Sequence, residues 1–233
     1  MDSLKFLRKY ETSEYELVTV EMCLASLTPD QRRLMENSTT VLEFKAHETI
    51  IKQGFVAAHI FLIESGVARL DVTNDGKIST VGLLGAGSFV GIMCSFACRN
   101  MDYSSVALEK TVVRMINMDV FQQLILENGE FALKLIKHMS WKTANMVHWI
   151  TRLADKNVDG ALSMMLHEFS KVYSSLEFSL PVNRIELAQM CGFSKESVIN
   201  SLSRMNADGI LAVSGKEIKI LSPERLMKIT VNA

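Results

Sequence analysis

The spacing of hydrophobic and polar positions changes twice along the chain and separates a strand-rich stretch from the helical stretches on either side. From residue 39 to about residue 117, short apolar runs alternate with glycine-bearing turns such as Glu64-Ser65-Gly66 and Asn74-Asp75-Gly76. Many short strands at this spacing predict a β-sandwich or jelly roll. The runs expected to form strands are 41–44, 49–51, 59–63, 67–72, 79–84, 104–108 and 111–116.

Helical patterns flank this stretch. Residues 1 to about 36 are expected to be helical, and Thr28-Pro29 marks a helix start because proline suits the first helical position. Beyond residue 117 the spacing predicts a short amphipathic helix over 120–125 and then a long helix over 130–154.

The long helix carries an apolar stripe at the spacing of a coiled-coil seam. We predict that this stripe pairs with a second copy of the chain. An alternative left open is that the helix packs on its own sandwich, a role that Ile136, Val147 and Ile150 also suit. Both can hold if one side of the helix meets the sandwich and the other meets a partner. The residues expected in the dimer interface follow a 3-4-3-4 spacing after Ala132 and are Leu135, Met139, Lys142, Met146, Trp149 and Leu153.

A hinge at residues 154–157 interrupts the helical pattern, and Asn157 is expected to cap the next helix. The organising feature of the C-terminal part follows at residues 183–215. Asn183 suits the start of a short helix, Gly192 suits a tight turn, and a second helix begins after Ser194, which is the pattern of a helix-turn-helix.

The sequence after this motif strengthens a nucleic-acid-binding interpretation. Two apolar runs, 210–213 and 217–221, flank a turn at 214–216 and predict a β-hairpin of the kind found in winged helices. Such a turn places Lys216 where it meets a backbone phosphate. The candidate DNA contacts are Arg184, Ser194, Lys195, Glu196, Ser197, Asn200, Arg204 and Lys216.

Composition limits the partners and compartments that we expect. The chain has 233 residues and a net charge of −1, so DNA affinity must come from a local arrangement of positive groups and must depend on salt. No apolar run approaches the ~20 residues that span a bilayer, and the N-terminus lacks a signal-peptide pattern. We therefore expect a cytoplasmic protein that does not enter membranes.

No catalytic or metal-binding pattern is evident in the sequence. It contains no Ser-His-Asp signature and no phosphate-binding glycine loop, so we expect no enzymatic activity. The cysteines are expected to be reduced and mostly buried, with no metal site, because their spacing matches no zinc or iron–sulfur pattern. They are Cys23, Cys94, Cys98 and Cys191.

Several segments together resemble the Crp/Fnr superfamily of bacterial transcription regulators. The segments that carry the resemblance are 61–68 in the sandwich, Gly87-Ser88-Phe89-Val90-Gly91, 186–198 in the helix-turn-helix, and 211–220 in the wing. The resemblance implies an α+β protein with a cyclic-nucleotide-binding-like sensor sandwich at 1–129, a dimerisation helix at 130–154 and a winged helix-turn-helix at 155–233. It also implies a homodimer on a palindromic DNA operator, with RNA polymerase as a further candidate partner.

The sensor segment departs from the members that respond to cyclic AMP. Ile92 stands where they carry a ribose-binding Glu, no Arg precedes Ser104, and Met146-Val147 replaces their adenine-contacting Thr-Ser pair. An apolar side chain cannot accept the ribose hydrogen bond, and a phosphate without an Arg lacks its bidentate partner, so cyclic AMP is not the expected effector. The candidate effector-pocket residues are Gly91, Ile92, Met93, Cys94, Tyr103, Ser104 and Met146.

The identity of the effector is left open by the sequence. The N-terminal cysteine cluster of the iron–sulfur members is absent, since only Cys23 lies in that part of the chain. The alternatives are an apolar ligand, haem, a redox signal, or no small ligand. Haem is kept open by the methionines and by His47, His59, His138 and His148. A regulatory module acting on protein partners is a further alternative, which the winged helix disfavours.

The second helix of the motif also departs from the family pattern. It keeps Glu196, but Asn200 occupies a position where many members carry a guanine-reading Arg. Glutamate accepts a hydrogen bond from cytosine N4, and asparagine suits adenine better than guanine. We therefore expect a DNA half-site that differs from the T-G-T-G-A type that is usual for the family.

Overall fold

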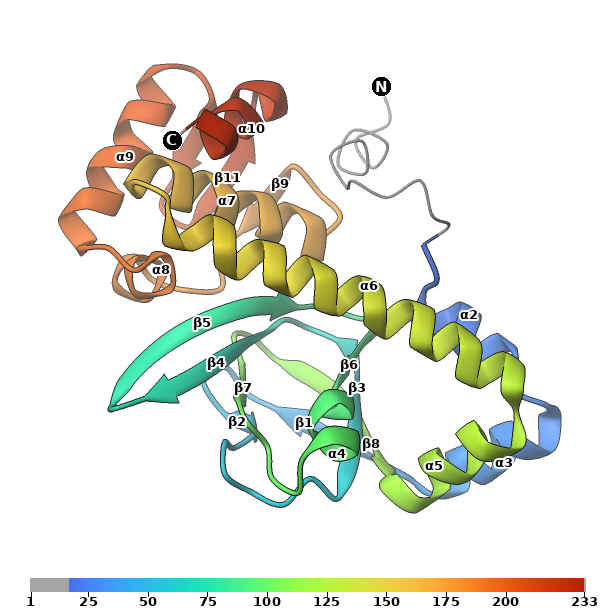
Figure 1. The fold of residues 1–233 in the computed structure, drawn as a ribbon. Helices are drawn as coiled ribbons and strands as arrows, with labels where there is room; N and C mark the ends of the chain where they lie inside the picture. The colour runs from blue at the N-terminus through green and yellow to red at the C-terminus, as the bar shows by residue number, and fades with distance from the viewer. Residues whose placement is uncertain (1–16, 233) are drawn as a thin grey trace. The chain divides into compact units, whose positions relative to one another are not determined.

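Two four-stranded antiparallel sheets form a β-sandwich in this computed structural model, which describes residues 17–232 (Figure 1). The first sheet has the order β1 (Thr39–Phe44), β8 (Thr111–Asn117), β3 (His59–Ser65) and β6 (Ser88–Val90). The second has the order β2 (Thr49–Ile51), β7 (Ser104–Ala107), β4 (Ala68–Asn74) and β5 (Lys77–Leu84). The sandwich expected from the sequence is confirmed.

Two short elements were not expected from the apolar pattern. Strand β6 has 3 residues, too few to show an alternation of its own. It leads into α4 (Ile92–Ala97), whose N-cap Gly91 offers no side chain to mark the helix start. Neither element has a local sequence signal, because β6 is short and the cap of α4 is a glycine. Their positions are set by packing on the sandwich, where β6 pairs with β3.

Helices α2 (Val20–Ala25), α3 (Pro29–Asn37), α5 (Met118–Glu127) and α6 (Gly129–Ala154) accompany the sandwich (Figure 1). Helix α3 starts as expected from Thr28-Pro29. The Thr28 hydroxyl accepts from the Gln31 N–H at 3.3 Å, and the Gln31 side chain accepts from the Thr28 N–H at 3.1 Å, which completes a capping box. The helical expectation for residues 1–16 lies outside the described residues.

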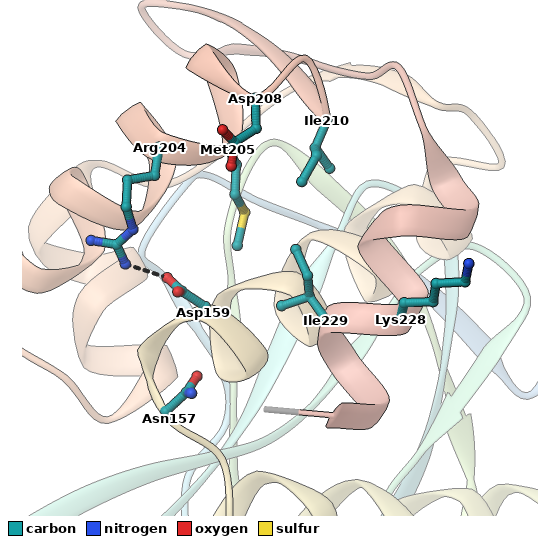
Figure 2. Close-up of a pocket in the computed structure, with 8 residues that line it drawn as sticks. All are labelled: Asn157, Asp159, Arg204, Met205, Asp208, Ile210, Lys228 and Ile229. Carbon is teal, nitrogen blue, oxygen red and sulfur yellow. Dashed lines mark hydrogen bonds and ion pairs between the residues drawn. The ribbon is translucent and has the colours of Figure 1, made fainter.

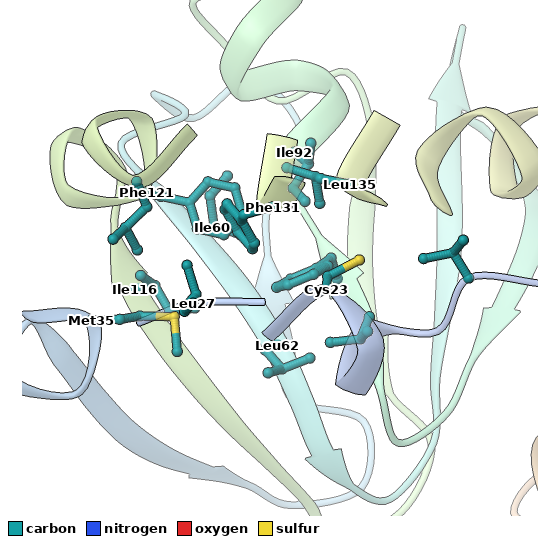
Figure 3. Close-up of a cluster of buried hydrophobic side chains, with 14 residues drawn as sticks. Cys23, Leu27, Met35, Ile60, Leu62, Ile92, Ile116, Phe121, Phe131 and Leu135 are labelled. Atoms are coloured by element: carbon teal, nitrogen blue, oxygen red, sulfur yellow. The ribbon is translucent and has the colours of Figure 1, made fainter. Parts of the chain in front are cut away.

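Alternation along the strands gives the first sheet an apolar layer on each face. Ile63 and Val90 point into the cluster between the two sheets. Leu62 and Phe89, one residue before each of them, belong to a second cluster that the helices cover. Figure 3 shows this second cluster, in which Phe121 of α5 lies among strand and helix side chains. The sensor part therefore has three layers: the second sheet, the first sheet and the helices. The first sheet lies in the middle and contributes side chains to both apolar clusters.

Contacts divide the chain into two compact units that separate between Val147 and His148, inside α6. The expected domain limits at residues 129 and 154 stay a prediction. The C-terminal unit contains α7 (Val158–Val172), β9 (Glu177–Ser179), α8 (Arg184–Cys191), α9 (Lys195–Ala207), β10 (Leu211–Ser214), β11 (Glu217–Ile220) and α10 (Pro223–Asn232).

The C-terminal unit adds two elements to those expected. The link expected near residues 178–182 begins with strand β9, which pairs with β11 and extends the hairpin to a three-stranded sheet. Helix α10 was not expected and packs against α7. Asn157 caps α7 as expected, because its side chain accepts from the Gly160 N–H at 3.0 Å.

Part of the stripe expected to form the dimer seam packs on the chain's own sandwich, and the assignment of its six residues to a dimer interface stays a prediction. Leu135 is a member of the helix-covered cluster, and Met139 packs against it. Met146 packs against the cluster between the sheets. The face that the sequence analysis offered to the sandwich, represented by Ile136 and Val147, is exposed instead.

Candidate nucleic-acid interface

Local capping signals set the geometry of the helix-turn-helix formed by α8 and α9. Asn183 caps α8 as expected and shares a capping box with Glu186, whose carboxylate accepts from the Asn183 N–H at 2.8 Å. Gly192 ends α8 with φ +78°, a left-handed conformation that glycine adopts without strain. Ser194 then caps α9 by accepting from the Ser197 N–H at 3.2 Å.

Helix α9 has one buried and one exposed face. Val198, Leu202 and Met205 are buried, as their spacing predicts. Among the described residues, no ion pair or hydrogen bond engages the side chains of Lys195, Glu196 or Asn200. This exposed face is therefore free to meet a molecule outside the chain. It consists of Lys195, Glu196, Ile199, Asn200 and Ser203.

The hairpin of β10 and β11 is held beside α9. The Asn206 side chain of α9 accepts from the Val213 N–H of β10 at 2.9 Å. The Arg184 guanidinium donates to the Gly215 carbonyl in the hairpin turn at 2.5 Å. A hollow of about 210 Å³ between these elements is lined by Arg184, Ile199, Leu202, Ser203, Asn206 and Val213.

The tip of the hairpin presents Lys216, which is exposed and has no ion pair among residues 17–232. A lysine on a flexible stem suits a phosphate as a point charge. Polar side chains along one helix face suit the base edges of a DNA major groove, which is wide enough to admit an α-helix. The exposed face of α9 and the tip of the hairpin therefore have the chemistry of a DNA-binding surface.

Models of two known domain families match the chain in the order of its units. The cyclic nucleotide-binding domain matches residues 41–128, and the Crp-like helix-turn-helix domain matches residues 146–229. The chain belongs to the Crp/Fnr family of transcription regulators. It is therefore a DNA-binding regulator, as its sequence predicts.

Individual relatives agree with this assignment. The anaerobic regulatory protein of Bacillus subtilis is 26% identical over 202 residues, which cover 82% of this chain and 84% of that protein. The transcriptional activator protein FnrA of Stutzerimonas stutzeri is 26% identical over 183 residues, which cover 76% and 75%. The structure of FixK2 from Bradyrhizobium japonicum shares the fold, with a TM-score of 0.75, 19% identity, and coverage of 84% of this chain and 98% of that one.

Two arginines expected to contact DNA in this Crp/Fnr regulator have partners within the chain. Arg204 forms an ion pair with Asp159 of α7, with 2.6 Å between Nη2 and Oδ1. Arg184 holds the hairpin turn through Gly215. The sequence placed both arginines near the interface, but their contacts fix protein elements. Ser194 and Ser197 are likewise engaged with each other as the α9 cap.

The candidate effector-pocket residues divide between the two apolar clusters. Cys94, Tyr103 and Met146 lie in or against the cluster between the sheets. Ile92 belongs to the helix-covered cluster instead, so it does not share a pocket with them. Met93 is exposed. The structure therefore brings together only part of the set.

Hydrogen bonds fix the remaining candidates. Tyr103 Oη accepts from the Gly91 N–H at 2.9 Å, and burial raises the pKa of this phenol, so it stays protonated. Ser104 Oγ accepts from the Gln53 N–H at 3.0 Å. Sequence reasoning passed over Ser105, which is fully buried and whose hydroxyl has no partner among the described residues.

Three of the cysteines are buried, while Cys98 is exposed, and all are free thiols. Burial raises the pKa of Cys23 to about 11 and that of Cys191 to about 12, so both stay protonated at neutral pH. Within residues 17–232, no group of three or more His, Cys, Asp or Glu side chains is placed to hold a metal ion. In the same part of the chain, no helix is long and apolar enough to cross a membrane.

One residue of the interface was missed by sequence reasoning. Ile199 lies on the exposed face of α9, and 37% of its surface is accessible. An isoleucine in a helical pattern is ordinarily assigned to the core, so only its offset from Val198 and Leu202 signalled exposure. Ile199 therefore adds an apolar contact to a surface whose other members, beside it, are polar or charged.

A half-buried histidine in α7, His167, predicts acid sensitivity of the DNA-binding unit. Burial lowers the pKa of His167 to about 4, whereas an unfolded histidine titrates near ~6.5. Between these two pH values His167 is protonated in the unfolded chain but neutral in the folded unit. The free energy of unfolding therefore decreases as pH falls from about 6.5 towards 4. We expect a loss of roughly 2 kcal/mol by about pH 5. Hydrogen exchange of α7 peptides at pH 7.5 and pH 5 measures it after correction for intrinsic exchange rates.

The control is His167→Gln, which cannot titrate. This variant should lose much less protection in α7 than the parent over the same pH change. Equal losses in both proteins would show that His167 does not set the acid sensitivity.

Proposed function

We propose that this Crp/Fnr regulator acts as a homodimer that reads a palindromic operator with one α9 helix per half-site. The observation that carries the proposal is the exposed face of α9, where Lys195, Glu196 and Asn200 have no partner among the described residues. The charge balance agrees with sequence-specific reading. Residues 158–233 contain eight basic and eight acidic side chains, so bulk attraction to DNA is weak.

The exposed stripe of α6 supports the dimer. Leu133, Ile136, Val147 and Ile150 are 54%, 62%, 54% and 46% exposed. With Ser140 and Thr143 between them, they follow the 3-4-3-4-3 spacing of a coiled-coil seam. A second copy that presents the same stripe buries these side chains, as a two-fold interface requires. We refer to these four apolar residues as the outer stripe.

The side chains of α9 predict the bases that are read. Glu196 accepts from cytosine N4, and Asn200 pairs with the N6/N7 edge of adenine. Ile199 lies between them in sequence and offers a methyl-bearing surface to the C5-methyl group of thymine. Lys216 contacts a backbone phosphate and fixes the register without reading sequence.

We propose further that the sensor controls α9 through α6 and that its effector is not cyclic AMP. Ile92 occupies the helix-covered cluster, and Met146 of α6 fills space beside the cluster between the sheets. Three buried polar atoms of the described residues have no hydrogen-bond partner, namely Ser95 Oγ, Ser105 Oγ and Trp149 Nε1, and of these the Ser105 hydroxyl lies on a sandwich strand. A small, mostly apolar effector with one hydrogen-bonding group suits this interior.

Selection of bound sequences from a random duplex pool tests the function. The purified protein should enrich a palindrome whose half-sites lie about one helical turn apart, with adenine facing Asn200. Binding should weaken steeply with salt and should not change when cyclic AMP is added. Failure to enrich any sequence, with and without extracts that supply an effector, would contradict the proposal.

Replacement of thymine by uracil tests the role of Ile199. Uracil lacks only the C5-methyl group, and burial of one such group contributes about 0.8 kcal/mol, so substitution in both half-sites should weaken binding about tenfold. Ile199→Ala should bind the thymine and uracil operators equally. Affinities from fluorescence anisotropy measure both effects.

The matched control for this variant is Ile78→Ala, at an exposed isoleucine of β5. This protein should keep the full preference for thymine. A preference that survives in Ile199→Ala would assign the methyl contact to another residue.

A further inference from the structure

A carboxylate from α7 contacts two side chains of α9 at once. The Ser201 hydroxyl donates to Asp159 Oδ1 at 2.5 Å, and Arg204 Nη2 donates to the same oxygen at 2.6 Å. Figure 2 shows the Arg204 side chain directed to Asp159. Ser201 is completely buried, so its hydroxyl has been withdrawn from water and depends on this partner. We call Asp159, Ser201 and Arg204 the carboxylate clamp.

The position of the clamp links it to the start of the DNA-binding unit. Asp159 lies in the first turn of α7, two residues after the cap Asn157 and shortly after α6 ends at Ala154. A carboxylate is favourable at this place because it faces the positive end of the helix dipole. Asp159 is therefore favourably placed at the start of α7, and from there it contacts α9.

A hollow lies beside the clamp. It measures about 370 Å³ and lies where α7, α9 and α10 meet (Figure 2). Its lining includes Asn157, Asp159, Arg204, Met205 and Ile229. The clamp lies at the rim of this hollow, so its polar contacts join α7 to α9 there in addition to the buried apolar face of α9.

Resting on the proposed function, we propose that Asp159 is a positioning residue that fixes the recognition helix α9 for DNA and withdraws Arg204 from it. Arg204 acts through Asp159 and does not contact a phosphate. The two roles of Arg204 predict opposite effects of Asp159→Asn. This change removes a negative charge. If it only releases Arg204 to a phosphate, the affinity for DNA should rise. If the clamp positions α9, the helix loosens and the affinity for the operator should fall.

The binding experiment compares Asp159→Asn, Arg204→Gln and the double variant on the selected operator and on random DNA. We expect each single change to weaken operator binding about tenfold and the double variant to lose no more than about tenfold, since partners of one contact are coupled. The affinity of each variant for random DNA should equal that of the parent protein. The salt slope should stay at the parent value, whereas Lys195→Gln, the matched control at an unpaired cation, should reduce it by about one per protomer.

A second measurement does not depend on DNA. Amide hydrogen exchange in α9 should rise in Asp159→Asn and in the milder variant Ser201→Ala, while exchange in the sensor strands stays constant. Unchanged exchange in α9, unchanged or tighter operator binding by Asp159→Asn, or a reduced salt slope in Arg204→Gln would each overturn the clamp. A parent protein that selects no operator contradicts the proposed function, and the exchange measurement then decides the clamp by itself.

Discussion

Ile136→Asp combined with Val147→Asp should convert the protein to a monomer and reduce its affinity for the palindromic operator by about 100-fold or more, because a linked second half-site ordinarily adds a factor of this order. Both side chains belong to the outer stripe and are more than half exposed. In the proposed dimer the new carboxylates lie near their symmetry mates, lose water and repel one another. Analytical ultracentrifugation measures the assembly, and fluorescence anisotropy measures the affinity.

Two variants separate the seam from general effects on the fold. Leu126→Asp makes the same kind of change on α5, at a side chain that is 78% exposed, and should leave both assembly and affinity as they are. Leu135→Ala should lower the free energy of unfolding by about 2–5 kcal/mol with no change in assembly, because Leu135 is a core residue of its own unit. A double variant that stays dimeric would show that the outer stripe is not the seam.

Gly66→Ala should lower the free energy of unfolding of the sensor unit by roughly 3–5 kcal/mol. Gly66 has φ +88°, and a Cβ there would lie 2.5 Å from the Lys110 carbonyl and 2.7 Å from the Thr111 Cα. These are backbone atoms of the neighbouring turn, which cannot move aside. Chemical denaturation followed by circular dichroism measures the loss.

Gly76→Ala is the control for backbone strain alone. Gly76 has φ +76°, but nothing lies within 4 Å of a Cβ at this position. We expect a cost of only about 1 kcal/mol, from the left-handed conformation. Similar losses in the two variants would show that contact with the turn at Lys110 is unimportant.

The sequence predicted those parts of the fold that depend on neighbouring residues. Asn183, Gly192 and Ser194 mark helix ends by their own side chains or lack of one, so the helix-turn-helix was correctly placed. The sandwich strands were recognised from alternation and turns. By contrast, β6 is too short to show an alternation and is held by its pairing with β3. Helix α10 was overlooked although Ser222-Pro223 repeats the start pattern of Thr28-Pro29.

The two stripes of α6 show why the side of this helix that packs on the sandwich could not be chosen from the sequence. Leu135 and Ile136 are adjacent, and the stripes to which they belong share the same 3-4 spacing. Periodicity identifies both stripes as apolar but does not state which one faces the sandwich. That choice is made by partners distant in sequence, such as Val18, whose carbonyl contacts His138 of α6 at 2.8 Å.

The residues of the DNA-binding surface could be predicted from the sequence where helical spacing alone places a side chain on the exposed face of α9. Lys195, Glu196 and Asn200 are exposed as expected. The ion pair of Arg204 was not predicted because its partner Asp159 lies 45 residues earlier in the chain. Ile199 was missed because apolar residues in a helical pattern are ordinarily counted as core.

The even charge of the DNA-binding unit has a consequence for how many molecules a cell needs. A strongly basic regulator spends most of its time on random chromosomal sequence, since a genome offers on the order of a million or more such sites. With eight basic and eight acidic residues in 158–233, we expect this protein to bind random DNA less tightly than a strongly basic regulator does. A larger share of its copies stays free, so operators can be filled from a small pool, and occupancy will follow changes in synthesis and degradation closely.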